Sequence, residues 1–186
     1  RIINKQIKKI FAKGKIEGEF VIPFNLDGTI AKNYKINAKV LDADININND
    51  LKIKNLSADI KYIFVSNRHK KINFLINQGK ILNLDLQKSS IDINLKDDNK
   101  IIKSIIKTNG ELKYPAIRII SSLLRFDLDS IKNLEMESNL ETFIQISLNK
   151  GFQITQKAFS VRGKINELNL EHKEVKGIKN FLPSYS

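Results

Sequence analysis

The chain has 186 residues, of which 41% are hydrophobic and 28% charged, so it is long enough for a domain with a substantial core and is not compositionally disordered. Cysteine is absent, which excludes disulfides, cysteine–zinc sites and thiol catalysis. A formal net charge of +12 raises nucleic acid or anionic membranes as partners. The lysines are scattered along nearly every segment, however, which favours a composition bias and solubility over a dedicated polyanion site.

The first segment, Arg1–Lys13, predicts a short amphipathic helix because its apolar residues recur at helical spacing: Ile3, Ile7, Ile10 and Phe11. Gly14 is expected to end this helix. A basic helix of this kind either lies on a membrane surface or docks on the rest of the protein through its apolar stripe, and we prefer the second interpretation. Because the chain begins at Arg1 rather than Met, we expect it to be a piece of a longer protein.

Residues 15–113 form a series of segments in which apolar and polar side chains alternate, separated by turn residues. This pattern predicts a run of β-hairpins. In one segment the apolar positions slip by one residue, from Tyr34, Ile36, Ala38 and Val40 to Leu41, Ala43, Ile45 and Ile47. The slip predicts a β-bulge near Val40 and Leu41, since otherwise the apolar set would change faces.

Residues 115–126 break the β pattern. Pro115 occupies a first helical position, and apolar residues follow at helical spacing, so we expect one helix with a buried face. Residues 131–170 then predict a long β-hairpin. Its first strand has apolar residues at alternate positions, with Ser138 and Thr142 in the same set, whose hydroxyls fit an open trough better than a dry core. Glu135, Glu137 and Glu141 are expected to face water, and 173–186 is a polar tail.

A catalytic or metal-binding constellation is not apparent. His69 and His172 are isolated in the sequence, and the motifs of phosphate-binding loops, zinc proteases and serine hydrolases do not occur. Asp127 and Asp129 lack the glycine and glutamate that complete a calcium loop. We therefore expect no enzymatic activity, no metal and no cofactor. Four aromatic residues are candidates for base stacking, but their alternation with Ile and Ala assigns them to the apolar side: Tyr34, Tyr62, Phe64 and Phe74.

Four stretches in order suggest a known arrangement. A predicted short helix that ends in glycine leads into a strand (Ile7–Phe20, IKKIFAKGKIEGEF), and a hairpin run follows that includes Leu51–Tyr62 (LKIKNLSADIKY). A strand glycine then leads to a proline-started helix (Thr108–Leu124, TNGELKYPAIRIISSLL). A long amphipathic strand follows, and the last strand has Phe, Val, Gly and Ile at alternate positions (Phe159–Ile165). This order resembles the central domain of AsmA-like envelope proteins of the YhdP and TamB kind. The resemblance covers most of the chain.

The resemblance implies a large periplasmic protein of the bacterial cell envelope, anchored in the inner membrane through a region that is not in this sequence. Its strands would curl into a long open groove along which phospholipids move toward the outer membrane. The implied partners are phospholipid acyl chains and flanking repeats of the same polypeptide, not nucleic acid. No enzyme activity or cofactor accompanies this family.

We therefore expect residues 1–186 to form a single, mainly β domain fragment with two short helices and a long, curved antiparallel sheet that forms an open groove. Two other hypotheses remain: an adhesin-like structural β-sandwich with a closed core and, less favoured, a basic nucleic-acid-binding β-domain. The residues expected to contact lipid are Ile60, Tyr62, Phe74, Leu84, Ile93, Leu140, Ile144, Ile146 and Phe159.

Overall fold

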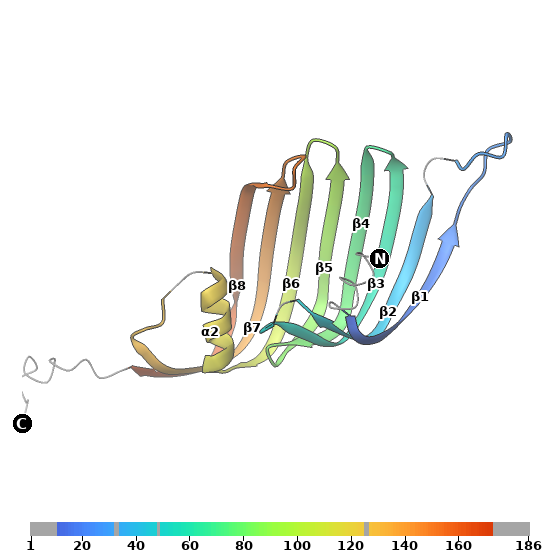
Figure 1. Cartoon of the computed structure of the whole chain (residues 1–186). Helices are drawn as coiled ribbons and strands as arrows, with labels where there is room; N and C mark the ends of the chain where they lie inside the picture. The colour runs from blue at the N-terminus through green and yellow to red at the C-terminus, as the bar shows by residue number, and fades with distance from the viewer. Residues whose placement is uncertain (1–10, 32–33, 48, 125–126, 173–186) are drawn as a thin grey trace, which may run out of the picture.

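The computed structural model describes residues 11–31, 34–47, 49–124 and 127–172. In this part of the chain, eight strands form one open antiparallel sheet whose spatial order is the order of the sequence (Figure 1). A single helix, α2 (Tyr114–Leu124), follows the sixth strand and precedes the seventh along the chain. The predicted mainly β fold with a long, curved, open antiparallel sheet is thus confirmed. The strands are β1 (Phe11–Val21), β2 (Lys35–Asn46), β3 (Lys52–Ser66), β4 (His69–Ile81), β5 (Leu84–Lys96), β6 (Lys100–Leu112), β7 (Ile131–Leu148) and β8 (Ile154–His172).

One face of the sheet is apolar from the first strand to the last. Residues paired across neighbouring strands share a face. A row of paired residues can therefore be followed from strand to strand across the whole sheet. One such row comprises Gly18, Ala38, Ile60, Phe74, Ile91, Ser104, Ile144 and Phe159, one residue from each strand. We call this the apolar face. The residues at the intervening positions of each strand, such as Glu17, Lys39 and Glu141, lie on the opposite, polar face.

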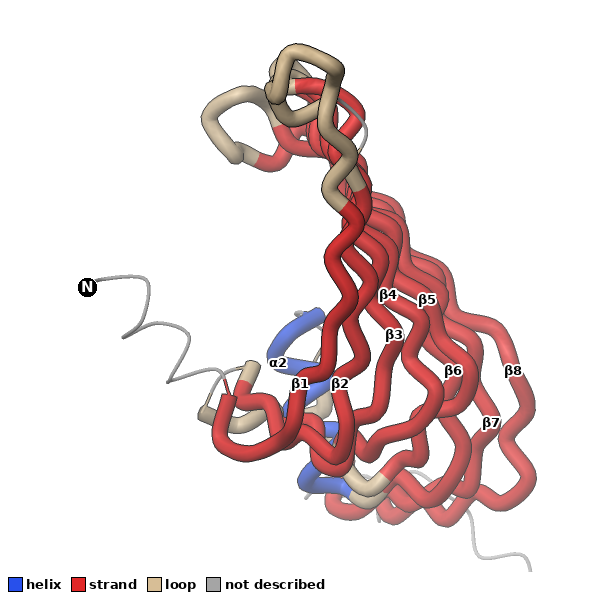
Figure 2. Tube along the Cα trace, turned by 90° about the vertical axis from the view of Figure 1, so that its right-hand side faces the viewer, coloured by secondary structure: helices blue, strands red, loops and turns tan. Residues whose placement is uncertain are grey.

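The sheet bends sharply toward its apolar face. The pairing register shifts between Val40 and Ala43 in β2, between Lys54 and Ser57 in β3, and between Gln87 and Ser90 in β5. Extra residues at such shifts bend a strand and increase its twist, and Asp42 and Asn55 adopt positive φ angles of 46° and 50° there. Figure 2 shows the result: the strands run straight and then curve into a hook that holds α2 on its inner side. The β-bulge predicted near Val40 and Leu41 is confirmed.

The predicted end of the N-terminal helix at Gly14 is wrong. Ten residues of the expected Arg1–Lys13 helix lie outside the described part of the chain, as does the tail 173–186, but the last three belong to β1, so Gly14 does not end a helix. Gly14 instead lies inside the strand, with a φ of 133°, and an added Cβ would stand 2.6 Å from the Cβ of Ala43. The same freedom that suits glycine to a helix end here permits a close backbone approach in the bend.

The buried core lies in the bend and under the helix. Six residues of β2–β5 form one cluster where the strands curve: Val40, Ala43, Leu56, Ala58, Ile76 and Leu86. A second cluster joins the sheet to α2 through Leu84, Leu112, Ala116 and Ile117. Helix α2 begins one residue before the predicted Pro115, and the Tyr114 hydroxyl donates a hydrogen bond of 3.0 Å to the Ile131 carbonyl at the start of β7. These contacts close the hook at its lower end and leave the upper part of the apolar face without a covering layer in the described residues.

Candidate functional site

The upper part of the apolar face is the candidate site. All nine predicted lipid contacts lie on this face. Seven of them lie in two neighbouring rows of paired residues above the bend: Ile60, Phe74, Ile144 and Phe159 in one, and Tyr62, Ile93 and Ile146 in the other. The sheet therefore brings together side chains from β3, β4, β5, β7 and β8 into one continuous surface, which we call the groove.

The other two predicted contacts lie elsewhere. Leu84 is only 5% exposed and belongs to the cluster that packs on α2, and Leu140 packs against that cluster. Leu84 is therefore a core residue beneath the helix. The alternating pattern could not separate these two positions from the other seven, because a residue covered by a helix and a residue facing an open groove are apolar for the same reason.

Groove side chains remain accessible to solvent. Phe159 is 49% exposed, and the other six predicted contacts above the bend are half-buried by their neighbours in the sheet. The predicted set of lipid contacts omits several apolar residues that lie in the same rows or in the edge strands β1 and β8. They are Ile16, Phe20, Ile36, Ile72, Ile91, Ile102, Val161 and Ile165. Alternation within each strand already marked them as apolar, but only the pairing register places them beside the predicted set. A contiguous exposed apolar surface that spans several strands is typical of an interaction site.

The hydroxyl groups of the apolar face are not all in the groove. Ser138 is completely buried, and its hydroxyl donates a hydrogen bond of 3.4 Å to the Gly110 carbonyl in the neighbouring strand. The expectation that Ser138 marks an open trough is therefore wrong, since a serine whose hydroxyl bonds to backbone is acceptable in a closed core. Thr142 is half-buried between Ile106 and Val161. Glu135, Glu137 and Glu141 lie on the polar face, as predicted.

Among the paired residues of the described strands, the charges on the apolar face are lysines, and all stand near the upper end: Lys70, Lys100 and Lys157. Lys100 is 8% exposed. Its ammonium group donates hydrogen bonds to the carbonyls of Asp97, Asn149 and Lys150 at 3.5, 3.2 and 3.2 Å. It also lies 4.4 Å from the ring centroid of Phe152. Lys100 thus joins the β5–β6 turn to the β7–β8 turn and holds this part of the upper rim of the groove in place.

We predict that Lys100→Met destabilises the fold by about 1–3 kcal/mol, because the turn carbonyls lose a charged donor while the apolar stem is kept. The free energy of unfolding in urea measures the effect. Lys103→Met is the control, since Lys103 is exposed on the polar face of the same strand. Equal stability of the two variants would contradict the bridging role.

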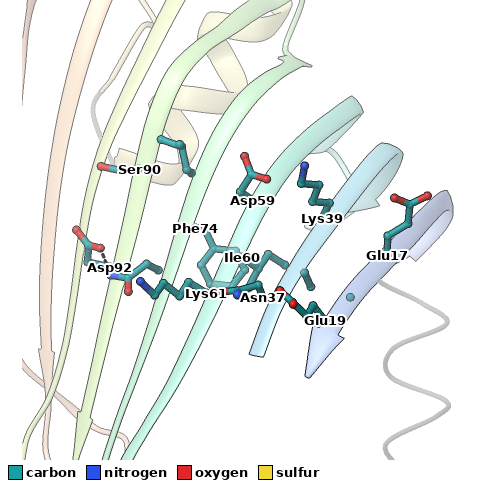
Figure 3. A pocket seen from close by; sticks show the side chains of 14 residues that line it. Glu17, Glu19, Asn37, Lys39, Asp59, Ile60, Lys61, Phe74, Ser90 and Asp92 are labelled. Atoms are coloured by element: carbon teal, nitrogen blue, oxygen red, sulfur yellow. Dashed lines mark hydrogen bonds between the residues drawn. The ribbon is translucent and has the colours of Figure 1, made fainter. Parts of the chain in front are cut away.

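The polar face has a hollow of its own, of about 730 Å³, across β1–β5. Figure 3 shows acidic and basic side chains that project into it from neighbouring strands, among them Glu17, Lys39, Asp59, Lys61 and Asp92. Its carboxylates already accept hydrogen bonds from amides: Asn77 donates to Asp59 at 2.8 Å, and Asn73 donates to Asp92. The charges that line this hollow alternate in sign from β1 to β3, as Glu17, Lys39 and Asp59 show.

A charged row on the polar face joins three strands. Lys107, Glu141 and Arg162 are direct neighbours in the pairing register of β6, β7 and β8. Arg162 Nε donates to Glu141 Oε1 at 2.9 Å, and Lys107 Nζ lies 3.4 Å from Oε2. The hydrogen bond from Arg162, assisted by Lys107, holds the pKa of Glu141 below its ordinary value of 4.5.

This lowered pKa predicts a pH dependence. A carboxyl whose pKa is lower in the folded chain stabilises the fold above its unfolded pKa, and the contribution is lost as the pH falls through the folded pKa. Glu141→Gln should therefore reduce the free energy of unfolding at neutral pH, and the difference from the unaltered chain should shrink on acidification below 4.5. Urea titrations at several pH values test this, and a pH-independent difference would contradict it.

The described residues contain no group of His, Asp or Glu side chains placed to hold a metal ion and no helix long and apolar enough to cross a membrane. Comparison of the chain with known protein families, curated proteins and solved structures gives no match. The assignment of function therefore relies on the geometry of the sheet itself.

Proposed function

We propose that this chain is a segment of a periplasmic, bridge-like phospholipid transfer protein that holds acyl chains along the groove and serves outer-membrane lipid homeostasis. The observation that carries the proposal is the pair of apolar rows that cross the sheet above the bend with no second layer over them in the described residues. The resemblance to AsmA-like envelope proteins supplies the cellular setting: anchorage in the inner membrane through a region outside this sequence.

The energetics suit an acyl chain. Apolar surface left in water costs roughly 25 cal/mol per Å², and an acyl chain gains about 0.8 kcal/mol for each CH₂ group that leaves water. The side chains of the groove are mainly aliphatic, and its described charges lie along its upper rim. Many similar weak contacts, rather than one deep pocket, would allow a chain to slide without a large barrier at any single position.

The two edge strands of the sheet are able to pair with further strands. Strands β1 and β8 are the first and last of the sheet, and every residue of β8 is exposed. An open edge strand presents unpaired backbone groups that another strand can extend. Flanking repeats of the same polypeptide could therefore lengthen the groove beyond the eight strands described.

The two competing functions are less well supported. A closed structural β-sandwich requires a second sheet over the apolar face, and in the described residues only α2 and the curved ends of the strands cover it. A nucleic-acid-binding face requires free aromatic rings. Tyr34 and Phe64 instead stack on each other with their ring centroids 4.7 Å apart, and these rings lie on the apolar side.

The decisive experiment places a photoreactive amino acid at Ile144, in the groove, and in a second variant at Gln145, the next residue and on the polar face. The full 186-residue chain is expressed in a bacterial envelope and irradiated, and covalent adducts are identified by mass spectrometry. We expect phospholipid adducts at position 144 at least several-fold above those at position 145. Equal labelling of the two positions, or no phospholipid in an organic extract of the purified chain, would refute the proposal.

A further inference from the structure

The connection between β1 and β2 projects beyond the upper end of the sheet (Figures 1 and 2). Residues 22–31 of this connection carry exposed apolar side chains. Leu26 is 110% exposed, Phe24 65% and Ile30 57%, and Ile22 at its base is also exposed. Polar turn residues would ordinarily occupy such a tip, because loops face water. Exposed large apolar residues held together at one projecting point indicate a contact surface.

Hydrogen bonds give this tip a defined shape. Phe24 and Ile30 form an antiparallel bridge, and the Asn25 backbone N–H donates to the Thr29 carbonyl at 2.8 Å. The Asp27 carboxylate accepts hydrogen bonds from both the backbone N–H and the hydroxyl of Thr29, at 2.9 and 2.6 Å. These bonds occupy the only carboxylate of the hairpin and leave Leu26 at its apex. We call residues 22–31 the tip hairpin.

The surroundings of the tip hairpin are basic. The same end of the sheet carries the other three hairpin turns, 66–70, 96–100 and 148–154, and the start of β2. Acidic residues there are Asp97 and Asp98, and Arg68 pairs with Asp97 at 3.4 Å. The exposed or half-buried basic residues of these segments are Lys35, Arg68, Lys70, Lys96 and Lys150, whereas Lys100 is buried and bonded to turn carbonyls. Lysine and arginine beside an exposed apolar tip are complementary to a membrane with anionic headgroups, to which each basic residue near the surface adds attraction.

We propose that the tip hairpin inserts into the interface of an anionic lipid membrane and sets the upper end of the sheet against that membrane. Phe24, Leu26 and Ile30 would enter the headgroup and acyl boundary, and the basic turns would meet phosphate groups. The upper rim of the groove, which carries the lysines of the apolar face, would then lie against the bilayer. This membrane contact lies within the chain itself, whereas the sequence led us to expect it only in regions outside.

The charge of this end favours a membrane over a second copy of the chain. Two copies that met through their tip hairpins would also bring their basic turns together, and like charges brought together are repelled. An anionic bilayer satisfies the apolar tip and the basic turns at once. The residues of the tip hairpin are not part of the groove. The membrane contact can therefore fail while the proposed function holds, and the reverse is also true.

The chain contains no tryptophan, so a single introduced indole reports on its own position. Leu26→Trp is compared with Leu75→Trp, which replaces a leucine that is 48% exposed on the polar face. Each variant is mixed with vesicles of phosphatidylcholine and phosphatidylglycerol. We expect Leu26→Trp emission to shift to the blue and to be quenched by brominated acyl chains, and Leu75→Trp emission to do neither.

Vesicle sedimentation provides the second measurement. Leu26→Asp should lower partitioning by about tenfold, Leu75→Asp should leave it unchanged, and raised salt should weaken binding of the unaltered chain. Ile144→Asp should retain vesicle binding, which separates this inference from the groove. Absence of vesicle binding, equal quenching of the two tryptophans, or a blue shift without vesicles in a dimeric chain would each overturn the proposal.

Discussion

Gly163→Ala is expected to destabilise the fold by about 3 kcal/mol or more, at the upper end of what overpacking costs. A Cβ at this position would overlap the Asn139 carbonyl oxygen and stand 2.9 Å from the Leu140 Cα. Both are backbone atoms of the neighbouring strand β7, so relief requires the β7–β8 pair to separate locally. Urea unfolding followed by far-ultraviolet circular dichroism measures the loss.

The control for this prediction is Gly151→Ala, in the β7–β8 turn. There an added Cβ would meet only the Asn149 side-chain oxygen, at 3.5 Å, so we expect a change within about 0.5 kcal/mol. Gly163 lies between Val161 and Ile165 on the wall of the groove, and its backbone contact depends on the register that pairs it with Leu140. An unfolding midpoint for Gly163→Ala equal to that of the unaltered chain would show that this register is wrong.

The second large effect is expected at the bend. Leu86→Ala should cost about 2–4 kcal/mol, because Leu86 is 5% exposed within the cluster that holds the curved strands together. It packs closely over Gly79, where an added Cβ would stand 3.2 Å from its Cδ1. Removal of this side chain leaves a cavity that the curved backbone cannot easily fill. The free energy of unfolding in urea again gives the value.

Leu75→Ala serves as the matched control, since the leucine lies exposed on the polar face of the neighbouring strand. We expect it to cost less than about 1 kcal/mol. A similar loss in both variants would mean that the bend does not contain the main core. A loss confined to Leu86→Ala would support a molecule whose stability resides in its lower half, which leaves the upper half of the apolar face available to a ligand.

The bend was only partly predictable. In β2 two apolar runs of opposite parity adjoin at Val40 and Leu41, and this slip was correctly interpreted as a bulge. In β3 the same event appears as a spacing of three, from Ile53 to Leu56, and in β5 as Leu86 followed by Ser89. Polar residues separate the two apolar runs at these sites, Lys54 and Asn55 in β3 and Gln87 and Lys88 in β5, so the change is equally compatible with a turn between two strands. Pairing between strands was needed to align the shifts.

The prediction that an N-terminal helix ends at Lys13 was wrong for a related reason. Phe11 completed a helical spacing, and Gly14 is a common residue after a helix, so both signals agreed on an end at Lys13. In the structure, Phe11 pairs with Ile45 in the sheet. Four apolar residues at helical spacing in a chain so rich in isoleucine do not distinguish a helix from the beginning of a strand, because the β1–β2 pairing supplies the deciding interactions.

The period of two in each segment determined, by itself, that this chain forms a sheet with one apolar and one polar face, because successive side chains of a strand point in opposite directions. Pro115 and the helical spacing after it likewise determined where the sheet is interrupted. Only the tertiary structure decided which apolar residues are core and which line the groove. Leu84 and Ile144 satisfy the same pattern, but the bend and α2 cover the first and leave the second uncovered. Burial in protein and contact with an acyl chain select the same side chains, so three-dimensional proximity has to separate them.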